Sequence, residues 1–264
     1  MPELPEVEAF RKIADRVLTG QRIENVWAAQ DDIVISDVAP RTLATKLKGR
    51  EVIGTDRRGK QAWLILDRPP HPVFHFGMTG HFEAIDQDSP RGKYIKLDLT
   101  TRDGRLVYDN RRRLGRIRLL DDPLTEPPIS KLGFDPLLEP ISSRALADRL
   151  VGRCGPIKAL LLDQSFIAGV GNWIADDVLY AAGIAPRRQA QSLDYDEVKR
   201  LRSAIVGVIR KAVSVDADSD RFPKGWLFHI RWGKPEGVET RKGEKVVFDE
   251  VGGRTTAWVP DRQK

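Results

Sequence analysis

The chain has 264 residues, of which 41% are hydrophobic and 31% charged, and its 44 Lys and Arg residues against 38 Asp and Glu residues give a formal net charge of +6. This composition excludes a disordered chain, and the single cysteine, Cys154, excludes an intramolecular disulfide and a cysteine-ligated zinc finger. We expect two domains and a place inside the cell, since the acidic start is not a signal peptide and no apolar run approaches the ~20 residues of a membrane span.

The first half of the chain reads as one helix followed by short strands. Val7, Phe10, Ile13 and Val17 follow helical spacing within the first 20 residues, and Gly20 ends the pattern. The β-rich runs after it predict strands at 23–28, 32–35, 51–57, 61–66, 73–76, 80–85, 94–99, 105–109 and 115–120, interrupted by a helix at 42–48. Regular short strands of this kind favour a sandwich or a barrel.

The second half is helical and ends in a hairpin. A proline-rich stretch over residues 121–140 marks the joint between the halves. Helices are predicted at 142–152, 156–162, 173–182 and 195–214, with Ser143, Asn172 and Asp194 as N-caps. Two further strands, 245–249 and 255–259, flank the turn Gly252-Gly253 and predict a hairpin.

The basic excess is concentrated in one segment. Residues 102–118 contain seven arginines and two acidic residues, and three of the arginines, 111–113, are consecutive. A solvated strand edge protected by charge is one interpretation. On a solvated strand edge, consecutive arginines would repel one another with no favourable interaction to offset the repulsion. A polyanion such as nucleic acid is therefore the better-supported partner.

The N-terminus carries unusual chemistry. Removal of Met1 would leave Pro2 with a free secondary amine, whose unperturbed pKa of about 8 makes it far more nucleophilic at pH 7 than a lysine. Attack on an aldehyde-like sugar carbon would give an iminium ion that has no N–H proton to lose and can drive an elimination. The alternative is that Pro2 and Glu3 simply begin a helix.

The start MPELPEVE resembles the N-terminus of the formamidopyrimidine-DNA glycosylase and endonuclease VIII superfamily. Six further segments agree with this superfamily in order: RRGK at 57–60, HFGMTG at 75–80, RRLG at 112–115, FIAGVGNWIADDVLYAAGI at 166–184 with PIKALLLDQ before it, WLFHIRWGKP at 226–235 and GGRTTAWVPDRQK at 252–264. The last two resemble the tail of plant and fungal members. The resemblance therefore covers the whole chain.

The resemblance implies an α+β fold. We expect an N-terminal catalytic domain at 1–125, a two-sheet β-sandwich with flanking helices, and then a linker at 126–140. A helix-two-turn-helix domain at 141–225 and a zincless β-hairpin finger at 226–264 follow. The common bacterial form holds its finger with four cysteines and zinc, and this hairpin has no such ligands, so we expect no metal and no cofactor.

The implied activity is that of a bifunctional DNA glycosylase and AP lyase of base excision repair. It would act as a monomer on damaged double-stranded DNA, excising ring-opened purines and further-oxidised guanines by base flipping, a proline Schiff base and β,δ-elimination. Its place would be the bacterial cytoplasm, at the nucleoid, or a eukaryotic nucleus. Two alternatives stay open here: an endonuclease VIII-like glycosylase for oxidised pyrimidines, and a non-catalytic lesion-binding protein.

The resemblance also assigns the site residues. Pro2 is the implied nucleophile, Glu3 the acid/base, Glu6 a supporting carboxylate, and Lys60 a phosphate contact and proton donor. Met78, Arg112 and Leu114 take the three wedge positions that fill the gap left by a flipped base. Leu114 stands where phenylalanine is usual, and Asn110 and Arg111 replace a common Asp-Pro. Phosphate contacts are implied for Asn172, between two helices, for Arg254, after the hairpin turn, and with less support for Lys93 and Lys158.

Overall fold

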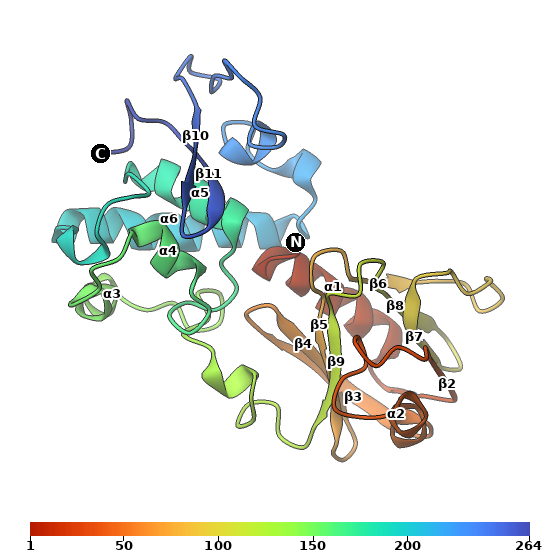
Figure 1. Ribbon diagram of the computed structural model, residues 1–264. Coiled ribbons are helices and arrows are strands. Elements are labelled where there is room, and N and C mark those ends of the chain that lie inside the picture. Colours follow the sequence, from red (N-terminus) through yellow and green to blue (C-terminus); the bar gives the residue numbers. More distant parts are fainter. The chain divides into compact units, whose positions relative to one another are not determined.

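The computed structural model describes all 264 residues and divides into two compact units, Met1–Lys131 and Leu132–Lys264. The first unit contains α1 (Leu4–Leu18), β1 (Gln21–Arg22), β2 (Asn25–Ala28), α2 (Pro40–Leu47), β3 (Glu51–Arg58), β4 (Gln61–Leu66), β5 (His71–His75), β6 (His81–Ala84), β7 (Ile95–Thr100), β8 (Arg105–Asp109) and β9 (Arg116–Leu120) (Figure 1). A short 3-10 turn, Ile129–Lys131, ends it. No helix of either unit has the length and apolarity needed to cross a bilayer.

The first unit is built from two antiparallel sheets. One has the strand order β1-β3-β4-β5-β9 and the other β2-β7-β8-β6. Aromatic side chains of both sheets meet in the core: the ring of Phe74 lies 4.8 Å from that of Phe82 and 5.7 Å from that of Tyr108, and α1 adds Phe10 at 4.9 Å from Phe76. The predicted two-sheet sandwich with flanking helices is confirmed.

The strand predicted at 32–35 is wrong. This segment is a turn, and only Ile35 forms an isolated bridge, with Ile117. The carboxylate of Asp31 accepts hydrogen bonds from the backbone N–H groups of Ile33 at 3.2 Å and Val34 at 3.1 Å. A side chain that captures neighbouring backbone donors in this way competes with strand pairing.

The second unit contains α3 (Ser143–Leu150), α4 (Ile157–Leu162), α5 (Asn172–Ala182), α6 (Tyr195–Ser214), β10 (Val247–Val251) and β11 (Arg254–Trp258), with 3-10 turns at Ala190–Ser192, Ser219–Arg221 and Leu227–His229. Helix α5 is buried on nearly all faces and packs against α6 and β11. The predicted helical domain with a terminal hairpin is confirmed.

The N-caps of these helices differ in part from the prediction. Asp194 caps α6, accepting from the Glu197 N–H at 2.8 Å, as predicted. Ser142 caps α3 in place of Ser143, and Gly171 precedes α5 in place of Asn172. Both errors are displacements of one residue, because a helix pattern alone does not fix its first residue.

Candidate active site and nucleic-acid interface

Helix α1 begins directly after the candidate nucleophile. Glu3 is its N-cap residue and is 2% exposed. The Glu3 backbone N–H donates to Glu6 Oε2 at 3.0 Å, which is one half of a capping box. Two sequence-predicted carboxylates are therefore held at the helix start beside Pro2, which is half-buried. The helix N-terminus favours negative charge at this point.

Lys60 lies in the tight turn between β3 and β4 and is 9% exposed. The turn needs Gly59, whose φ is +57°. Its geometry is tied to α1 through Arg57, which donates from Nε to Glu8 Oε2 at 3.1 Å and from Nη1 to the Gly59 carbonyl at 3.0 Å. Arg57 thus joins the second turn of α1 to the residue before Lys60.

Glu8 is the anionic end of this connection. Burial raises the pKa of the Glu8 carboxyl, but hydrogen bonds and charge from Arg11 and Arg57 outweigh it and leave the pKa below its usual value. Arg11 contacts Glu8 at 2.8 Å, so a pair of guanidiniums shares one carboxylate. Neither Arg57 nor Glu8 was predicted from the sequence as a site residue, although Arg57 is the first residue of the RRGK segment.

His75 adds a neutral imidazole on the strand that pairs with β4. Its partner in the register is Gln61, the residue after Lys60. Burial, followed by the positive charge of Lys60, lowers the pKa of His75 from 6.5 to about 4. The ring is therefore uncharged at neutral pH and does not repel the Lys60 ammonium.

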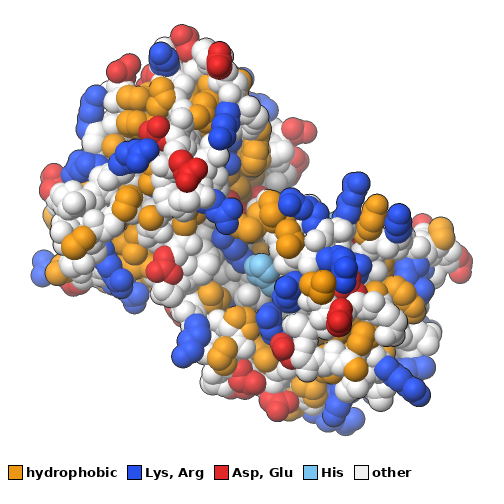
Figure 2. All heavy atoms as spheres, in the orientation of Figure 1, with side chains coloured by type: hydrophobic (Ala, Val, Ile, Leu, Met, Phe, Trp, Pro, Cys, Tyr) orange, Lys and Arg blue, Asp and Glu red, His pale blue; other side chains and the backbone are white.

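The three wedge residues lie on two loops that pack together. Met78, in the loop between β5 and β6, is 40% exposed, and Leu114, between β8 and β9, is 44% exposed. Arg112 is exposed on the second loop. A Cβ on Gly77 would collide with the Leu114 backbone, so the close approach of the loops requires glycine there. Figure 2 shows Lys and Arg side chains beside exposed hydrophobic ones over β6 to β9.

Asn110 is the hydrogen-bonding hub between these loops. It is completely buried, and its Nδ2 donates to the Phe76 carbonyl at 3.1 Å and to the Tyr108 hydroxyl at 2.8 Å. Its Oδ1 accepts from the backbone N–H groups of Leu114 at 3.1 Å and Gly115 at 3.3 Å. One side chain therefore fixes the Met78 loop and the Leu114 loop together.

The three consecutive arginines have three different surroundings. Arg111 lies over the ring of Tyr94, 5.2 Å from its centroid. Arg112 is exposed, whereas Arg113 binds Asp31 with both Nε and Nη2, at 2.9 and 3.1 Å, while its backbone takes a φ of +55°. Although burial opposes it, Arg113 and Lys96 hold the pKa of Asp31 well below its usual value.

Some arginines of the segment 102–118 form ion pairs within the fold. Arg105 is buried in an ion pair with Asp98 at 2.8 Å, and Arg118 pairs with Asp37 at 3.1 Å. Lys93 is exposed, with its ammonium 5.7 Å from the centroid of Tyr94. A count of basic residues therefore overstates the positive charge available to a ligand.

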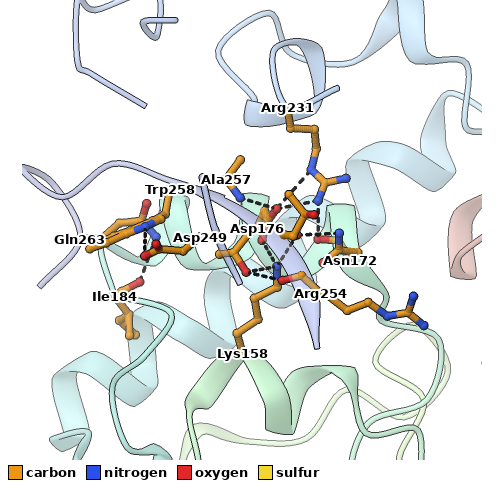
Figure 3. A network of polar contacts seen from close by, with 12 residues as sticks. Lys158, Asn172, Asp176, Ile184, Arg231, Asp249, Arg254, Ala257, Trp258 and Gln263 are labelled. Atoms are coloured by element: carbon orange, nitrogen blue, oxygen red, sulfur yellow. Dashed lines mark hydrogen bonds and ion pairs between the residues drawn. The ribbon is translucent and has the colours of Figure 1, made fainter. Parts of the chain in front are cut away.

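The second unit holds the other three sequence-predicted residues. Asn172 and Arg254 belong to neighbouring elements, since Asn172 Nδ2 donates to the carbonyl of Thr255 at 2.9 Å. Arg254 is exposed and its guanidinium points away from the surrounding polar network (Figure 3). Lys158, in contrast, is fully buried and pairs with Asp176 at 2.6 Å, so its ammonium is not at the surface.

The residues around the hairpin do not fit zinc. Cys154 is the only cysteine, and no three His, Cys, Asp or Glu side chains gather closely enough to hold a metal ion. The hairpin is held by other contacts, among them the register pair Phe248 and Ala257 and the hydrogen bond from Trp258 Nε1 to Asp249 Oδ2 at 3.1 Å.

Two family profiles match the chain. The formamidopyrimidine-DNA glycosylase N-terminal domain matches residues 1–117, and the formamidopyrimidine-DNA glycosylase H2TH domain matches residues 132–224. A formamidopyrimidine-DNA glycosylase of Arabidopsis thaliana is 43% identical over 100% of this chain and 71% of its own length. One from Desulfitobacterium hafniense is 32% identical over 98% of both chains.

Solved structures of the same kind are also similar. The Lactococcus lactis formamidopyrimidine-DNA glycosylase, bound non-covalently to DNA with an AP site, superposes with a TM-score of 0.87 at 27% identity over 99% of both chains. A mutant of the Lactococcus lactis enzyme, in complex with Fapy-dG-containing DNA, gives a TM-score of 0.88 at 28% identity over 100% of both chains. Sequence and fold thus agree along the whole chain.

Proposed function

This chain belongs to the formamidopyrimidine-DNA glycosylase family, and we propose that it excises oxidised bases from duplex DNA and then cleaves the abasic site through Pro2. Members of this family are enzymes of base excision repair with glycosylase and AP lyase activity. The observation that carries the proposal is the start of α1, where Glu3 is buried and hydrogen-bonded to Glu6 directly after Pro2. An activity on damaged chromosomal DNA belongs at a bacterial nucleoid or in a eukaryotic nucleus.

The proposed covalent step begins after removal of Met1. The lone pair of the Pro2 amine attacks C1′ of the damaged nucleotide, and the base leaves with the electrons of the glycosidic bond and takes up a proton. The adduct nitrogen then loses its proton, and Glu3 protonates the ring oxygen so that the C1′–O4′ bond breaks, giving an iminium ion that carries no N–H. Loss of a C2′ proton expels the 3′ phosphate, and a second elimination expels the 5′ phosphate.

The surrounding residues would set the DNA for this step. Lys60, in a turn fixed by Arg57, is suited to hold a phosphate beside the lesion and to protonate a leaving oxygen. Met78, Arg112 and Leu114 would fill the gap left by the flipped nucleotide. Their two loops are locked together by Asn110, which gives the wedge a fixed shape. In the second unit, Asn172 and Arg254 would bind flanking phosphates.

Borohydride trapping tests the proposal. The mature protein, with loss of Met1 verified by intact mass, is incubated with duplexes that contain a formamidopyrimidine, an oxidised pyrimidine or an abasic site, and the adduct is mapped by peptide mass spectrometry. We expect an adduct at residue 2 that is strongest with the ring-opened purine and with the abasic site. The variant Pro2→Leu, which keeps Met1 in place, is the matched control and should give none.

The outcomes separate the three candidate functions. Absence of an adduct at any residue on every substrate refutes the lyase and leaves a lesion-binding protein. An adduct confined to oxidised pyrimidines supports the endonuclease VIII-like alternative. Trapping at a lysine in place of residue 2 would contradict the proposed nucleophile while leaving the enzyme class intact.

A further inference from the structure

A buried charge cluster lies at the centre of the second unit. The carboxylate of Asp176, on α5, contacts the Lys158 ammonium at 2.6 Å and the Arg231 guanidinium at 2.7 Å. Lys158 and Asp176 are at most 1% exposed and Arg231 is 7% exposed. Figure 3 shows Asp176 between the two cations. The proposed reaction does not use these three residues as reacting groups.

The cluster binds the terminal hairpin along β11. Asp176 Oδ2 accepts from the Ala257 N–H at 3.1 Å. Lys158 Nζ donates to the Thr255 carbonyl at 3.2 Å and to Thr256 Oγ1 at 2.8 Å. Three consecutive hairpin residues, all directly after Arg254, are thus bonded to the same pair of opposite charges.

The same cluster reaches the other candidate phosphate ligand. Arg231 Nη2 donates to the Asn172 carbonyl at 3.4 Å, and Asn172 Nδ2 donates to the Thr255 carbonyl that also receives Lys158. Helix α5 carries both Asn172 and Asp176, one turn apart. The position of Arg254 relative to Asn172 is therefore defined by one connected set of bonds.

Apolar packing supports the hairpin farther from its tip. Tyr180, Leu227, Val246, Ala257 and Val259 form one buried cluster. At the tip, Gly252 approaches α4 closely, since a Cβ there would lie 3.1 Å from Ala159. The residues next to Arg254 are held chiefly by polar bonds, whose directions fix a position more sharply than apolar contact does.

We propose that Asp176, with Lys158 and Arg231, is the positioning centre of the zincless hairpin, a central charge that joins four separate segments as a metal ion would and sets Arg254 beside Asn172. We call the bonds from Lys158, Asp176 and Arg231 to residues 255–257 and to Asn172 the clamp. The role of Arg254 in this inference rests on the proposed function, whereas the clamp does not. A central anion fits this task because each of its partners is a directed donor, and because loss of the anion would leave two buried cations without a counter-charge. Lys158 then acts through Arg254, as a positioning residue, and not as a phosphate ligand.

Hydrogen exchange in the absence of DNA tests the clamp. Asp176→Asn removes the central charge at constant shape, and Lys158→Met is the milder variant, since Asp176 keeps Arg231. We expect amide exchange in residues 254–258 to become about tenfold faster or more in both variants. Glu250→Gln is the matched control, the same kind of change on an exposed carboxylate of the hairpin, and should leave 254–258 unchanged. Unchanged exchange in Lys158→Met overturns the proposal, even if Asp176→Asn fails to fold.

A double-mutant cycle with Arg254→Ala tests the link to DNA. Arg254→Ala should lower the salt dependence of duplex binding by about one released ion. Lys158→Met should produce the same change, and the double variant should bind no worse than Arg254→Ala alone. Fully additive losses would overturn the positioning role. If the wild-type protein forms no borohydride adduct, the proposed function fails, and the exchange measurement still decides the clamp.

Discussion

Asn110→Asp is the sharpest test of how the wedge is built. The substitution keeps the shape of the side chain and keeps an oxygen that accepts from the Leu114 and Gly115 N–H groups. It removes the NH₂ group that donates to the Phe76 carbonyl at 3.1 Å and turns an oxygen toward that carbonyl. The Met78 loop therefore loses its hydrogen bond to Asn110, while the Leu114 loop keeps its own.

The expected magnitude follows from the buried groups involved. The Phe76 carbonyl keeps the Gly80 N–H at 2.8 Å, and the variant loses the two hydrogen bonds that Asn110 donates to Phe76 and Tyr108. At about 1 kcal/mol each, we expect the free energy of unfolding to fall by about 2 kcal/mol. Asn110→Ala loses all four hydrogen bonds at a site with no solvent access, and at about 1 kcal/mol each the loss is about 4 kcal/mol. If the wedge carries the Asn110→Asp cost during base extrusion, extrusion slows by about 30-fold.

Two assays separate wedge function from chemistry. A fluorescent base analogue beside the lesion reports extrusion in the duplex, and cleavage of an abasic site in single-stranded DNA reports the chemistry, which needs no wedge. Asn110→Asp should slow the first and spare the second, and Asn25→Asp, the same change at an exposed position of β2, should affect neither. Equal losses in both assays, or none in either, would refute the reasoning.

Three further predictions concern the first unit. The pKa of His75, about 4 in the folded protein and 6.5 in the unfolded chain, makes stability fall as the pH drops below 6.5, because the unfolded chain binds the extra proton. Between pH 7.5 and 5 urea unfolding should register a loss of about 2 kcal/mol that is absent from His75→Gln, and an equal loss in that variant would exclude His75 as the source. Arg57→Met should reduce borohydride trapping by about tenfold or more, because the Lys60 turn loses the hydrogen bonds that connect it to α1. The control Arg68→Met, at an exposed position, should leave trapping unchanged. Trapping at the wild-type level in both variants would contradict the role of Arg57. Leu114→Phe, at an exposed site with room for a ring, should tighten binding to lesion duplexes by about fivefold through stacking on the base. If the wild type and Leu114→Phe have identical dissociation constants with all four opposite bases, Leu114 has no wedge role.

The elements were predictable where the pattern is local. Helix α6 was expected at 195–214 and spans Tyr195–Ser214, because its apolar spacing and its capping box lie within its own sequence. The segment 32–35 failed because Asp31, one residue outside it, captures its backbone donors. A hydrophobic alternation carries no information on such a competing side chain.

The reacting groups of the candidate site could be predicted from the sequence, whereas the residues that hold them and the DNA-binding loops in place could not. Pro2, Glu3 and Lys60 could be named from motifs, since the chemistry demands those residue types at those positions. Asn110 was visible only as a departure from a common pattern, because its partners lie on separate loops and strands. Lys158 was expected at a phosphate, and its burial depends on Asp176 and Arg231, which only the folded chain brings to it.

The segment Arg111–Arg112–Arg113 shows that three identical letters are three different residues. One lies on an aromatic ring, one faces solvent, and one is bound to Asp31 from a left-handed backbone conformation that costs an ordinary side chain about 1–2 kcal/mol. An alignment column that accepts any basic residue would treat them as interchangeable, and a scan of single variants should divide them into separate phenotypes. Only Arg112 is free to report on ligand recognition, and a variant of Arg113 reports first on the shape of the loop that presents its neighbour.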